Sequence, residues 1–515
     1  YVQGVSVTAS REVPGPQVSC LFTDIGGVAE APAVAPADPV AGYPEDRARA
    51  EAARCLQCSC LECVNACSYL EHYGSYPKLY ARKVLHNLYM VKGAHTANRM
   101  INSCSLCGLC GQVCPTGVDM GAMLKQVRRR MVRQEQMPPS AHDFALRDLA
   151  FSNGPDAALA RSAPHTTSSS YAFFPGCQLP ASDPGSVDRT YRYLRETLGA
   201  VGLILRCCGA PADWAGRQDL VASTWQDFDT AWAALGRPTL VLACTSCAAQ
   251  FAEHRPDVPV TSLWSVLDAY GPPPGTPPAP PGQVLTIHDP CTARQDTAVQ
   301  DAVRRVLDTL GYRVAELPHS RRRTECCSYG GLQWLANREV AELAVQRRIA
   351  QSPHDYLTYC VMCRDLFADR GKPSLHLLDL LGGDDLAARA ARPGPGYTQR
   401  HENRARLKRD LLRDLWGEQM DDPGDGPAIR LRVDAQVRER LEDRLILDAD
   451  LAQVIAQAES TGAVLRDPRT GHLLAHHRPH AVTYWVEYTR DGDVYAVHRA
   501  YSHRMQVIEG DPGGR

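Results

Sequence analysis

Two patterns of apolar and polar residues alternate through the middle of the chain. Short apolar runs such as SYAFF, LVLA and QVLTI are typical of buried strands. Amphipathic stretches such as TWQDFDTAWAAL and ANREVAELAVQRRIA are typical of helices. Strands and helices that alternate in this way predict α/β units with parallel strands. Cysteines follow several of the apolar runs, and such folds place their ligands at the C-terminal ends of strands.

The last part of the chain, residues 396–515, has a different pattern and contains no cysteine. A charged helix is predicted around LKRDLLRDLWGE, and two further helices are predicted within residues 434–460. Alternating apolar residues then predict strands at VTYWVEY and VYAVHRAY, with turns at DPRTG and TRDGD. We expect this segment to form a small α+β domain with a docking or capping role. Its histidines match no zinc spacing well: His472, His476, His477, His480, His498 and His503.

Length and charge narrow the classes of function. A chain of 515 residues is long enough for about three or four domains. The net charge is −2 and charges of both signs are spread along the chain, which favours no nucleic-acid partner. No apolar run approaches the ~20 residues of a membrane helix, and no secretory leader follows Tyr1. We expect a soluble cytoplasmic protein, or an internal piece of a longer one.

Nineteen of the twenty cysteines gather in groups, a pattern that favours metal or redox sites in a reducing compartment over a disulfide scaffold. The most regular group is INSCSLCGLCGQVCP. Its cysteines and the following Pro115 form the C-x2-C-x2-C-x3-C-P run of bacterial ferredoxins, in which three thiolates hold one 4Fe-4S cluster and the fourth crosses to a second cluster. The four cysteines are Cys104, Cys107, Cys110 and Cys114.

A second group lies upstream in EAARCLQCSCLECVNAC and holds one cysteine too many. Cys60, Cys63 and Cys67 match the last three cysteines of the ferredoxin spacing. In that alignment, however, Gln57 occupies the position of the first cysteine. The alternative spacing, C-x2-C-x4-C-x3-C, resembles the cluster-binding segment of the glutamate synthase small subunit. We favour this second choice, so that the ligands are Cys55, Cys58, Cys63 and Cys67, with Cys60 either a bystander or a thiol that supports the cluster from nearby. A pair of zinc knuckles is the structural alternative for both groups.

The remaining cysteines of interest form two sets of five with similar intervals, which indicates an internal duplication. The proline-rich segment GPPPGTPPAPPG, residues 271–282, links the two copies. Each set contains two adjacent cysteines, which suit a single tetrahedral metal poorly. The first set is Cys177, Cys207, Cys208, Cys244 and Cys247. The second set is Cys291, Cys326, Cys327, Cys360 and Cys363.

This arrangement resembles the paired cysteine-rich (CCG) domains of heterodisulfide reductase catalytic subunits, over roughly residues 46–395. The resemblance implies that each set holds a noncubane 4Fe-4S cluster and that the ten cysteines act on a disulfide substrate. It also implies two cubane clusters in the preceding module, four clusters in all, and no zinc site. Electrons would come from a flavoprotein or ferredoxin partner, with FAD on a partner subunit or fused domain. A thiol or disulfide small molecule, a sulfur-carrier protein and a peripheral membrane complex are the further partners implied.

These patterns predict an α/β and α+β multidomain fold. We expect an N-terminal extension or flavoprotein tail at residues 1–45, and a helical dicluster ferredoxin module at 46–150. Cysteine-rich α/β domains should follow at 151–275 and 276–395, and the α+β domain at 396–515. Disulfide reduction is the first of three hypotheses. The second is an electron relay between a flavin dehydrogenase, for a 2-hydroxy acid or glycerol phosphate, and quinone or another carrier. The third is a zinc-bearing structural scaffold.

Several other residues invite an interpretation. The second copy reads CCSYGG, with Ser328 where the first copy has Gly209, and we expect Gly330 and Gly331 to supply the backbone freedom instead. The run Arg128–Arg130 is predicted to be the solvated face of a helix. The following are expected to be surface or core residues more often than functional ones: Arg206, Asp213, Trp214, Arg321, Arg322, Arg323 and His376.

Overall fold

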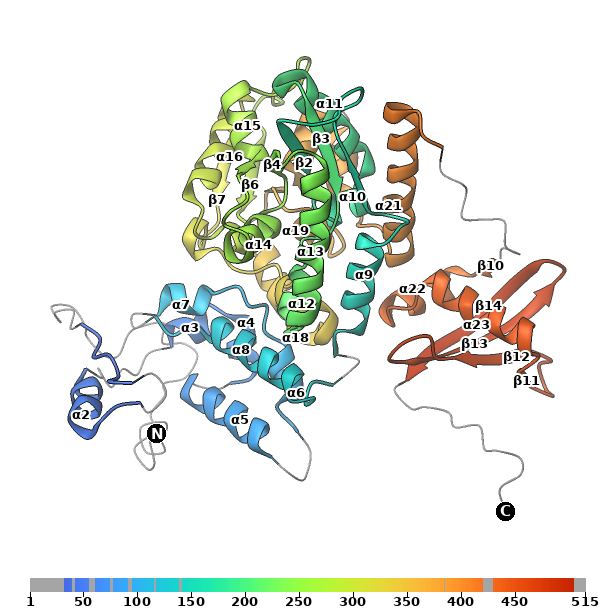
Figure 1. The fold of residues 1–515 in the computed structure, drawn as a ribbon, viewed down its shortest axis with the longest axis horizontal. Helices are drawn as coiled ribbons and strands as arrows, with labels where there is room; N and C mark the ends of the chain where they lie inside the picture. Colours follow the sequence, from blue (N-terminus) through green and yellow to red (C-terminus); the bar gives the residue numbers. More distant parts are fainter. Residues whose placement is uncertain are drawn as a thin grey trace.

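The computed structural model describes residues 32–38, 42–54, 61–74, 77–90, 95–114, 117–138, 141–383, 385–419 and 429–503. Figure 1 shows the N-terminal helices on one side of a central body that holds two parallel sheets, with the C-terminal sheet beside it. Among the described residues, every helix is too short or too polar to cross a lipid bilayer. The α/β and α+β multidomain class predicted from the sequence is confirmed.

The N-terminal part is helical. Its longest helix, α8, begins after Asp119, whose carboxylate accepts a hydrogen bond from the Ala122 N–H at 3.0 Å and so caps the helix. Apolar side chains of α5 and α8 form a core with the cysteine-bearing loops. The helices are α2 (Glu45–Ala53), α3 (Glu62–Asn65), α4 (Ser68–His72), α5 (Pro77–Tyr89), α6 (Asn98–Asn102), α7 (Leu109–Val113), α8 (Met120–Arg133) and α9 (Asp143–Asn153).

The first α/β unit is built on a five-stranded sheet with the order β1-β3-β2-β4-β5. Only β1 runs antiparallel to its neighbour. The strands are β1 (Leu159–Arg161), β2 (Tyr171–Phe174), β3 (Val201–Leu205), β4 (Thr239–Leu242) and β5 (Val260–Ser262). The helices are α10 (Gln178–Ser182), α11 (Pro184–Leu198), α12 (Ala210–Ala215), α13 (Gln218–Ala234), α14 (Thr245–His254) and α15 (Leu263–Tyr270).

The second α/β unit repeats this arrangement. Its four strands are all parallel and follow the order β7-β6-β8-β9, which matches β3-β2-β4-β5 of the first unit. The strands are β6 (Val284–His288), β7 (Arg313–Glu316), β8 (Tyr356–Thr358) and β9 (Ser374–His376). The principal helices are α16 (Thr297–Thr309), α17 (Gln333–Ala336), α18 (Arg338–Ile349), α19 (Val361–Ala368) and α20 (Leu386–Ala391), with short 3-10 turns η3 (Cys291–Ala293), η4 (Arg321–Arg323), η5 (Gly330–Leu332) and η6 (Leu377–Leu381). The internal duplication is therefore confirmed in three dimensions.

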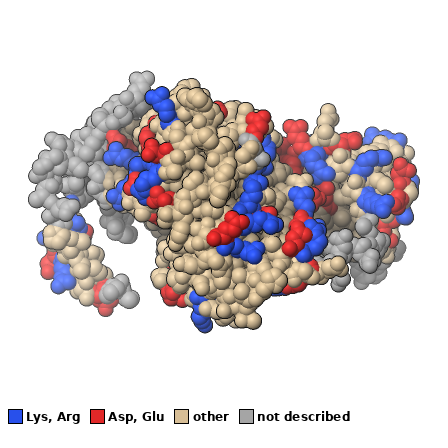
Figure 2. All heavy atoms as spheres, turned by 90° about the horizontal axis from the view of Figure 1, so that it is seen from above, with Lys and Arg blue, Asp and Glu red and all other residues tan. Residues whose placement is uncertain are grey.

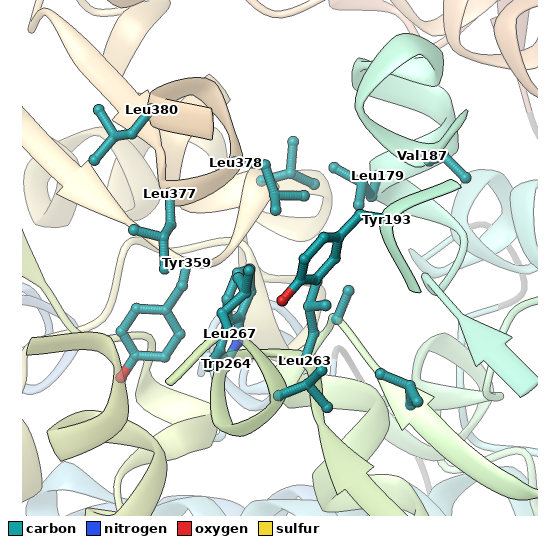
Figure 3. Close-up of a cluster of buried hydrophobic side chains, with 14 of the residues drawn as sticks. Leu179, Val187, Tyr193, Leu263, Trp264, Leu267, Tyr359, Leu377, Leu378 and Leu380 are labelled. Carbon is teal, nitrogen blue, oxygen red and sulfur yellow. The ribbon is translucent and has the colours of Figure 1, made fainter. Parts of the chain in front are cut away.

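One apolar core runs through both units. The Trp264 side chain on α15 is 1 % exposed, and its ring centroid lies 6.0 Å from that of Tyr359 and 5.8 Å from that of His376, both in the second unit. Figure 3 shows Trp264 and Tyr359 with leucines of η6 and α15 around them. Because the same buried surface stabilises both units, we expect them to unfold together.

The C-terminal segment divides into two parts. Helix α21 (Tyr397–Leu411) and the π-helical turn Leu412–Trp416 pack on the first α/β unit, where Asn403 donates a hydrogen bond to the Ala181 carbonyl at 2.7 Å. The rest forms a separate sheet with two helices, as Figure 1 shows. Its elements are β10 (Arg430–Val433), α22 (Ala435–Asp443), α23 (Asp448–Thr461), β11 (Leu465–Arg466), β12 (Leu473–His477), β13 (Thr483–Asp491) and β14 (Val494–His503).

This sheet has the order β10-β14-β13-β12-β11. Strands β11 to β14 are antiparallel, as the alternating residues and turns predict, but β10 joins β14 in parallel and had no sequence signal of its own. Lys, Arg, Asp and Glu side chains are intermixed in small groups over the molecular face in Figure 2. That face therefore has no large region of one charge, in agreement with the near-neutral composition.

Candidate functional site

The thiols of the first set converge at the C-terminal ends of three neighbouring strands. Cys177 follows β2, the adjacent cysteines follow β3, and Cys244 follows β4, with Cys247 in the first turn of α14. Their thiols form a chain of hydrogen-bonded neighbours in the order Cys177, Cys207, Cys208, Cys247 and Cys244. The adjacent pair thus connects the two outer parts of the set. All five side chains line one cavity of about 60 Å³.

The second set is arranged in the same way after β6, β7 and β8. Its sulfur atoms are 3.9 Å apart in the Cys291–Cys326 pair and 3.0 Å apart in the Cys327–Cys363 pair. Cys326 and Cys327 are also hydrogen-bonded neighbours, and so are Cys360 and Cys363. All cysteines in the described part of the chain are free thiols. The structure therefore brings together the two predicted sets without disulfide bonds.

The second cysteine of each adjacent pair is made acidic by its neighbours. Hydrogen bonds from Cys207 and Cys247 lower the pKa of Cys208 to about 6, although burial opposes this shift. Hydrogen bonds from Cys326 and Cys363 lower the pKa of Cys327 to about 5. Further deprotonation would place several negative charges in contact inside a buried site, which is costly unless cations neutralise them. Contacting, buried sulfur donors of this kind fit iron–sulfur clusters.

Gly331 supplies the backbone freedom that was expected of Gly330 and Gly331, with a φ angle of +59°, but Ser328 is also left-handed. The φ angle of Ser328 is +80°, close to the +85° of Gly209 in the first copy. The Ser328 N–H donates a hydrogen bond to the Cys326 sulfur at 3.2 Å, and the Gly209 N–H does the same to Cys207. The Ser328 hydroxyl donates to the Ala341 carbonyl at 3.0 Å. This buried hydrogen bond offsets part of the strain of a left-handed serine.

The thiols of the ferredoxin-like run meet one thiol of the upstream group. Cys67 is close enough to Cys104, Cys107 and Cys110 for their charges to influence one another, and burial raises the pKa of Cys67 above its ordinary value. Backbone N–H groups of Leu106 and Met120 donate to the sulfurs of Cys104 and Cys110 at 3.4 and 3.3 Å. These buried, N–H-bonded thiols suit cluster ligands. Cys63 and Cys114 lie within the described part of the chain, whereas Cys55, Cys58, Cys60 and Pro115 lie outside it.

Arg128 is fully buried, so its assignment to a solvated helix face was wrong. Its guanidinium donates to the carbonyls of Ile101, Cys104, Trp214 and Gly331 at 2.7–3.1 Å. It therefore joins the ferredoxin-like loop to both cysteine-rich units. Desolvation lowers the pKa of Arg128 to about 10. The available signal was its position on α8, on the same face as the buried residues Leu124, Val127 and Met131.

Asp213 forms a second junction between the modules. Its carboxylate is fully buried and accepts from Lys125 Nζ at 2.5 Å and Arg129 Nη2 at 2.8 Å, both on α8. These two cations hold its pKa below the ordinary value, although burial alone would raise it. Trp214, the next residue, lines the cavity. Four arginines that were expected to be surface residues form ion pairs or are exposed. Arg206 pairs with Asp227 and Arg321 pairs with Asp301, whereas Arg322 and Arg323 are exposed.

The second unit also contributes to the cavity. Tyr329, Cys360, Met362 and His376 line it together with the first set of cysteines. The ring centroids of Trp214 and Tyr329 are 6.4 Å apart in an edge-to-face arrangement. His376 is the buried core residue that was predicted, and its Nδ1 accepts from the Leu378 N–H at 3.3 Å. The cavity is therefore walled by both copies, with most of its thiols from the first.

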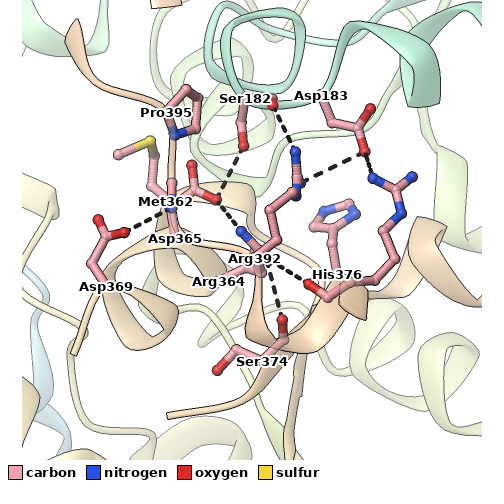
Figure 4. A network of polar contacts seen from close by, with 12 residues as sticks. Ser182, Asp183, Met362, Arg364, Asp365, Asp369, Ser374, His376, Arg392 and Pro395 are labelled. Atoms are coloured by element: carbon pink, nitrogen blue, oxygen red, sulfur yellow. Dashed lines mark hydrogen bonds and ion pairs between the residues drawn. The ribbon is translucent and has the colours of Figure 1, made fainter. Parts of the chain in front are cut away.

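A buried polar network surrounds Met362 and His376, two of the residues that line the cavity (Figure 4). Asp365 on α19 accepts from the Ser182 hydroxyl at 3.0 Å and from Arg400 Nη2 at 2.5 Å. Arg404, also on α21, donates to the Cys177 carbonyl at 3.1 Å and to Asp148 at 2.7 Å. Helix α21 thus contributes two buried arginines to the surroundings of the first set, although it was predicted as part of the C-terminal unit. Sequence reasoning missed both arginines because their partners are distant in the chain.

Comparison with known proteins agrees with the two kinds of cysteine site. A family model for a 4Fe-4S dicluster domain matches residues 54–119. A family model for a cysteine-rich domain matches twice, at residues 171–252 and 285–364. No solved structure matches the chain significantly.

Two curated relatives match different lengths of the chain. A fumarate reductase (CoM/CoB) subunit of Methanothermobacter marburgensis is 22 % identical over 363 residues, which cover 65 % of this chain and 72 % of that protein. Lactate utilization protein B of Bacillus cereus is 31 % identical over 96 residues, which cover 18 % of this chain and 20 % of that protein.

Proposed function

Since this chain is an iron–sulfur electron-transfer protein of the heterodisulfide reductase-like kind, with a dicluster domain and two cysteine-rich domains, we propose that it reduces or forms a disulfide. The donor is a flavin or ferredoxin partner, with FAD on another subunit or a fused domain. The observation that carries the proposal is the cavity: five thiols of the first set and Cys360 of the second line the same space.

The ligands follow from the groups of contacting thiols. Two cubane clusters are assigned to the dicluster module, on Cys55, Cys58, Cys63, Cys67, Cys104, Cys107, Cys110 and Cys114. Two noncubane clusters are assigned to the two sets of five cysteines. When bound, such clusters supply one-electron transfer and soft iron that can bind sulfur. Cys244 directly precedes α14, and hydrogen bonds from the Cys247 thiol and from the Cys247 and Ser246 N–H groups lower the pKa of Cys244 to about 7, which favours its thiolate form.

The walls of the cavity suit a small sulfur compound. Trp214, Tyr329 and Met362 offer aromatic and thioether surface, and sulfur binds such surface favourably. Disulfide reduction requires two electrons, whereas an iron–sulfur site provides one at a time, so two successive one-electron transfers are needed to complete it. We further propose a cytoplasmic location. The partners are a donor subunit, a thiol or disulfide molecule or a sulfur-carrier protein, and a peripherally attached membrane complex.

A second candidate is an electron relay between a flavin dehydrogenase and quinone or another carrier. It is favoured by the names of the relatives, one a subunit of a fumarate reductase and the other a lactate utilization protein. A relay needs no substrate cavity, so the two candidates differ in their response to thiols.

Metal analysis and a thiol titration test both candidates. Anaerobically purified protein is expected to contain roughly 16 iron atoms per chain if all four sites hold four-iron clusters. Disulfides added to the reduced protein should change the electron paramagnetic resonance (EPR) signals of the cysteine-rich sites. Abundant zinc with little iron would exclude both candidates, and full iron content without any thiol or disulfide response would favour the relay.

A further inference from the structure

The two cysteine-rich sets differ in their contact with the dicluster module. The thiol of Cys107, in the ferredoxin-like run, is a hydrogen-bonded neighbour of Cys326 in the second set. The hydrogen-bonded chain of the first set, by contrast, runs through its own five thiols. The duplication therefore produced two similar sites in unlike positions.

Arg294 holds the two loops of this thiol contact together. Its side chain is buried, and it donates to the Cys107 carbonyl at 3.2 Å, to the Arg322 carbonyl at 2.6 Å and to the Thr324 carbonyl at 2.7 Å. Arg294 lies three residues after Cys291. The corresponding residue after Cys177 is Pro180, which has no side-chain donor. The first copy therefore has no arginine at this position that could make the corresponding hydrogen bonds.

Gly331 brings the second set close to the dicluster backbone. A Cβ atom at this position would lie 2.5 Å from the Cys104 carbonyl oxygen and 2.5 Å from the Ser105 carbonyl carbon. Only glycine fits such an approach. The equivalent position in the first copy, four residues after the adjacent pair, is Ala212. The first copy meets the dicluster module later in its sequence, through Asp213 and through Gly216, where an added Cβ would lie 2.6 Å from the Arg128 carbonyl carbon.

The first set faces the cavity instead. All of its thiols line the cavity, whereas the second set contributes one. We infer that electrons enter the cysteine-rich pair at the second set and reach the first set from there, so that the second set relays electrons and the first acts on the substrate. This division of roles rests on the proposed function. Each transfer oxidises one site and reduces the next by one electron, with no bond made or broken.

The order of reduction tests the inference in the iron-loaded full chain, without any substrate. The protein is mixed with dithionite as the one-electron reductant, and freeze-quenched samples are followed by EPR. Cys363→Ser disables the second set, and the matched change Cys247→Ser disables the first. We expect Cys363→Ser to abolish rapid reduction of the first set, and Cys247→Ser to leave reduction of the second set unchanged. Rapid reduction of the first set in Cys363→Ser would overturn the inference.

Arg294 provides a test that leaves every thiol in place. Arg294→Met should abolish the rapid reduction phase of the second set while iron content stays unchanged, and Arg294→Lys should restore part of it. Arg305→Met is the matched control, because Arg305 pairs with Asp268 on the surface. Unchanged reduction kinetics in Arg294→Met would contradict the role of this contact. Because both tests measure cluster reduction, they can succeed even if the thiol titration fails, and the reverse also holds.

Discussion

Ser328 and Gly209 hold the same left-handed backbone position directly after their cysteine pairs, with φ angles of +80° and +85°. Each donates its N–H to the first sulfur of its pair. The two copies therefore share one loop geometry, although one uses a residue that strains it. A non-glycine residue in this region costs about 1–2 kcal/mol, and a neutral hydrogen bond returns about 1 kcal/mol.

Exchange of these two residues should have unequal effects. Ser328→Gly removes both the strain and the bond to the Ala341 carbonyl, so its free energy of unfolding should change by less than about 1 kcal/mol. Gly209→Ser adds strain, and its Cβ would lie 3.3 Å from Thr224 Cγ2, so a loss of about 1–2 kcal/mol is expected. Denaturant unfolding of the iron-loaded protein measures both. Equal losses in the two variants would show that the loops are not equivalent.

Arg128 should be far more sensitive to substitution than its neighbours on α8. Arg128→Met leaves four carbonyls without this donor, and because each unsatisfied buried acceptor costs about 1–3 kcal/mol, a total loss of about 3 kcal/mol or more is expected. Arg130→Met is the matched control, because Arg130 donates a hydrogen bond to the exposed Gln134 side chain and lies over the ring of the exposed Tyr89. Chemical unfolding and iron content should both separate the variants. A loss of stability in Arg128→Met no larger than in the control would contradict the junction role.

Buried His142 should make the protein less stable in mild acid. Burial, with the charge of Arg128, lowers the pKa of His142 to about 3, whereas an unfolded histidine has a pKa of about 6.5. Between these values the unfolded chain binds a proton that the folded chain does not. The free energy of unfolding should therefore fall by about 1.4 kcal/mol for each pH unit below about pH 6 on account of this residue.

The slope of stability against pH tests this prediction. Urea unfolding of the iron-loaded protein between about pH 7 and about pH 5 should give a shallower slope for His142→Gln than for the parent chain. His86→Gln serves as the control, because His86 is exposed on α5. Parallel slopes for the parent and His142→Gln would mean that His142 is not kept neutral by the fold.

The sequence predicts the structural features that repeat along the chain and those that depend on the spacing between residues. Strand periodicity and the two cysteine sets led to the duplicated parallel sheets, and the apolar surroundings of His376 led to its place in the core. The roles of Arg128, Arg294 and Arg404 could not be predicted, because their partners are mainly backbone carbonyls of distant segments. Such carbonyls are present in every residue and leave no pattern in the sequence. Strand β10 was missed for a similar reason, since its pairing with β14 depends on the tertiary fold.

Trp214 should affect the binding of a sulfur compound without affecting the clusters. It lines the cavity beside Tyr329, with the two rings edge to face, and among the described residues it makes no hydrogen bond to a thiol. Loss of an aromatic contact is worth about 0.5–1.5 kcal/mol. Trp214→Leu should therefore raise the disulfide concentration that gives half of the EPR response by about 2- to 10-fold. Trp485→Leu, in the C-terminal sheet, is the control. An unchanged half-saturating concentration in Trp214→Leu, with iron content intact, would place the substrate elsewhere than in this cavity.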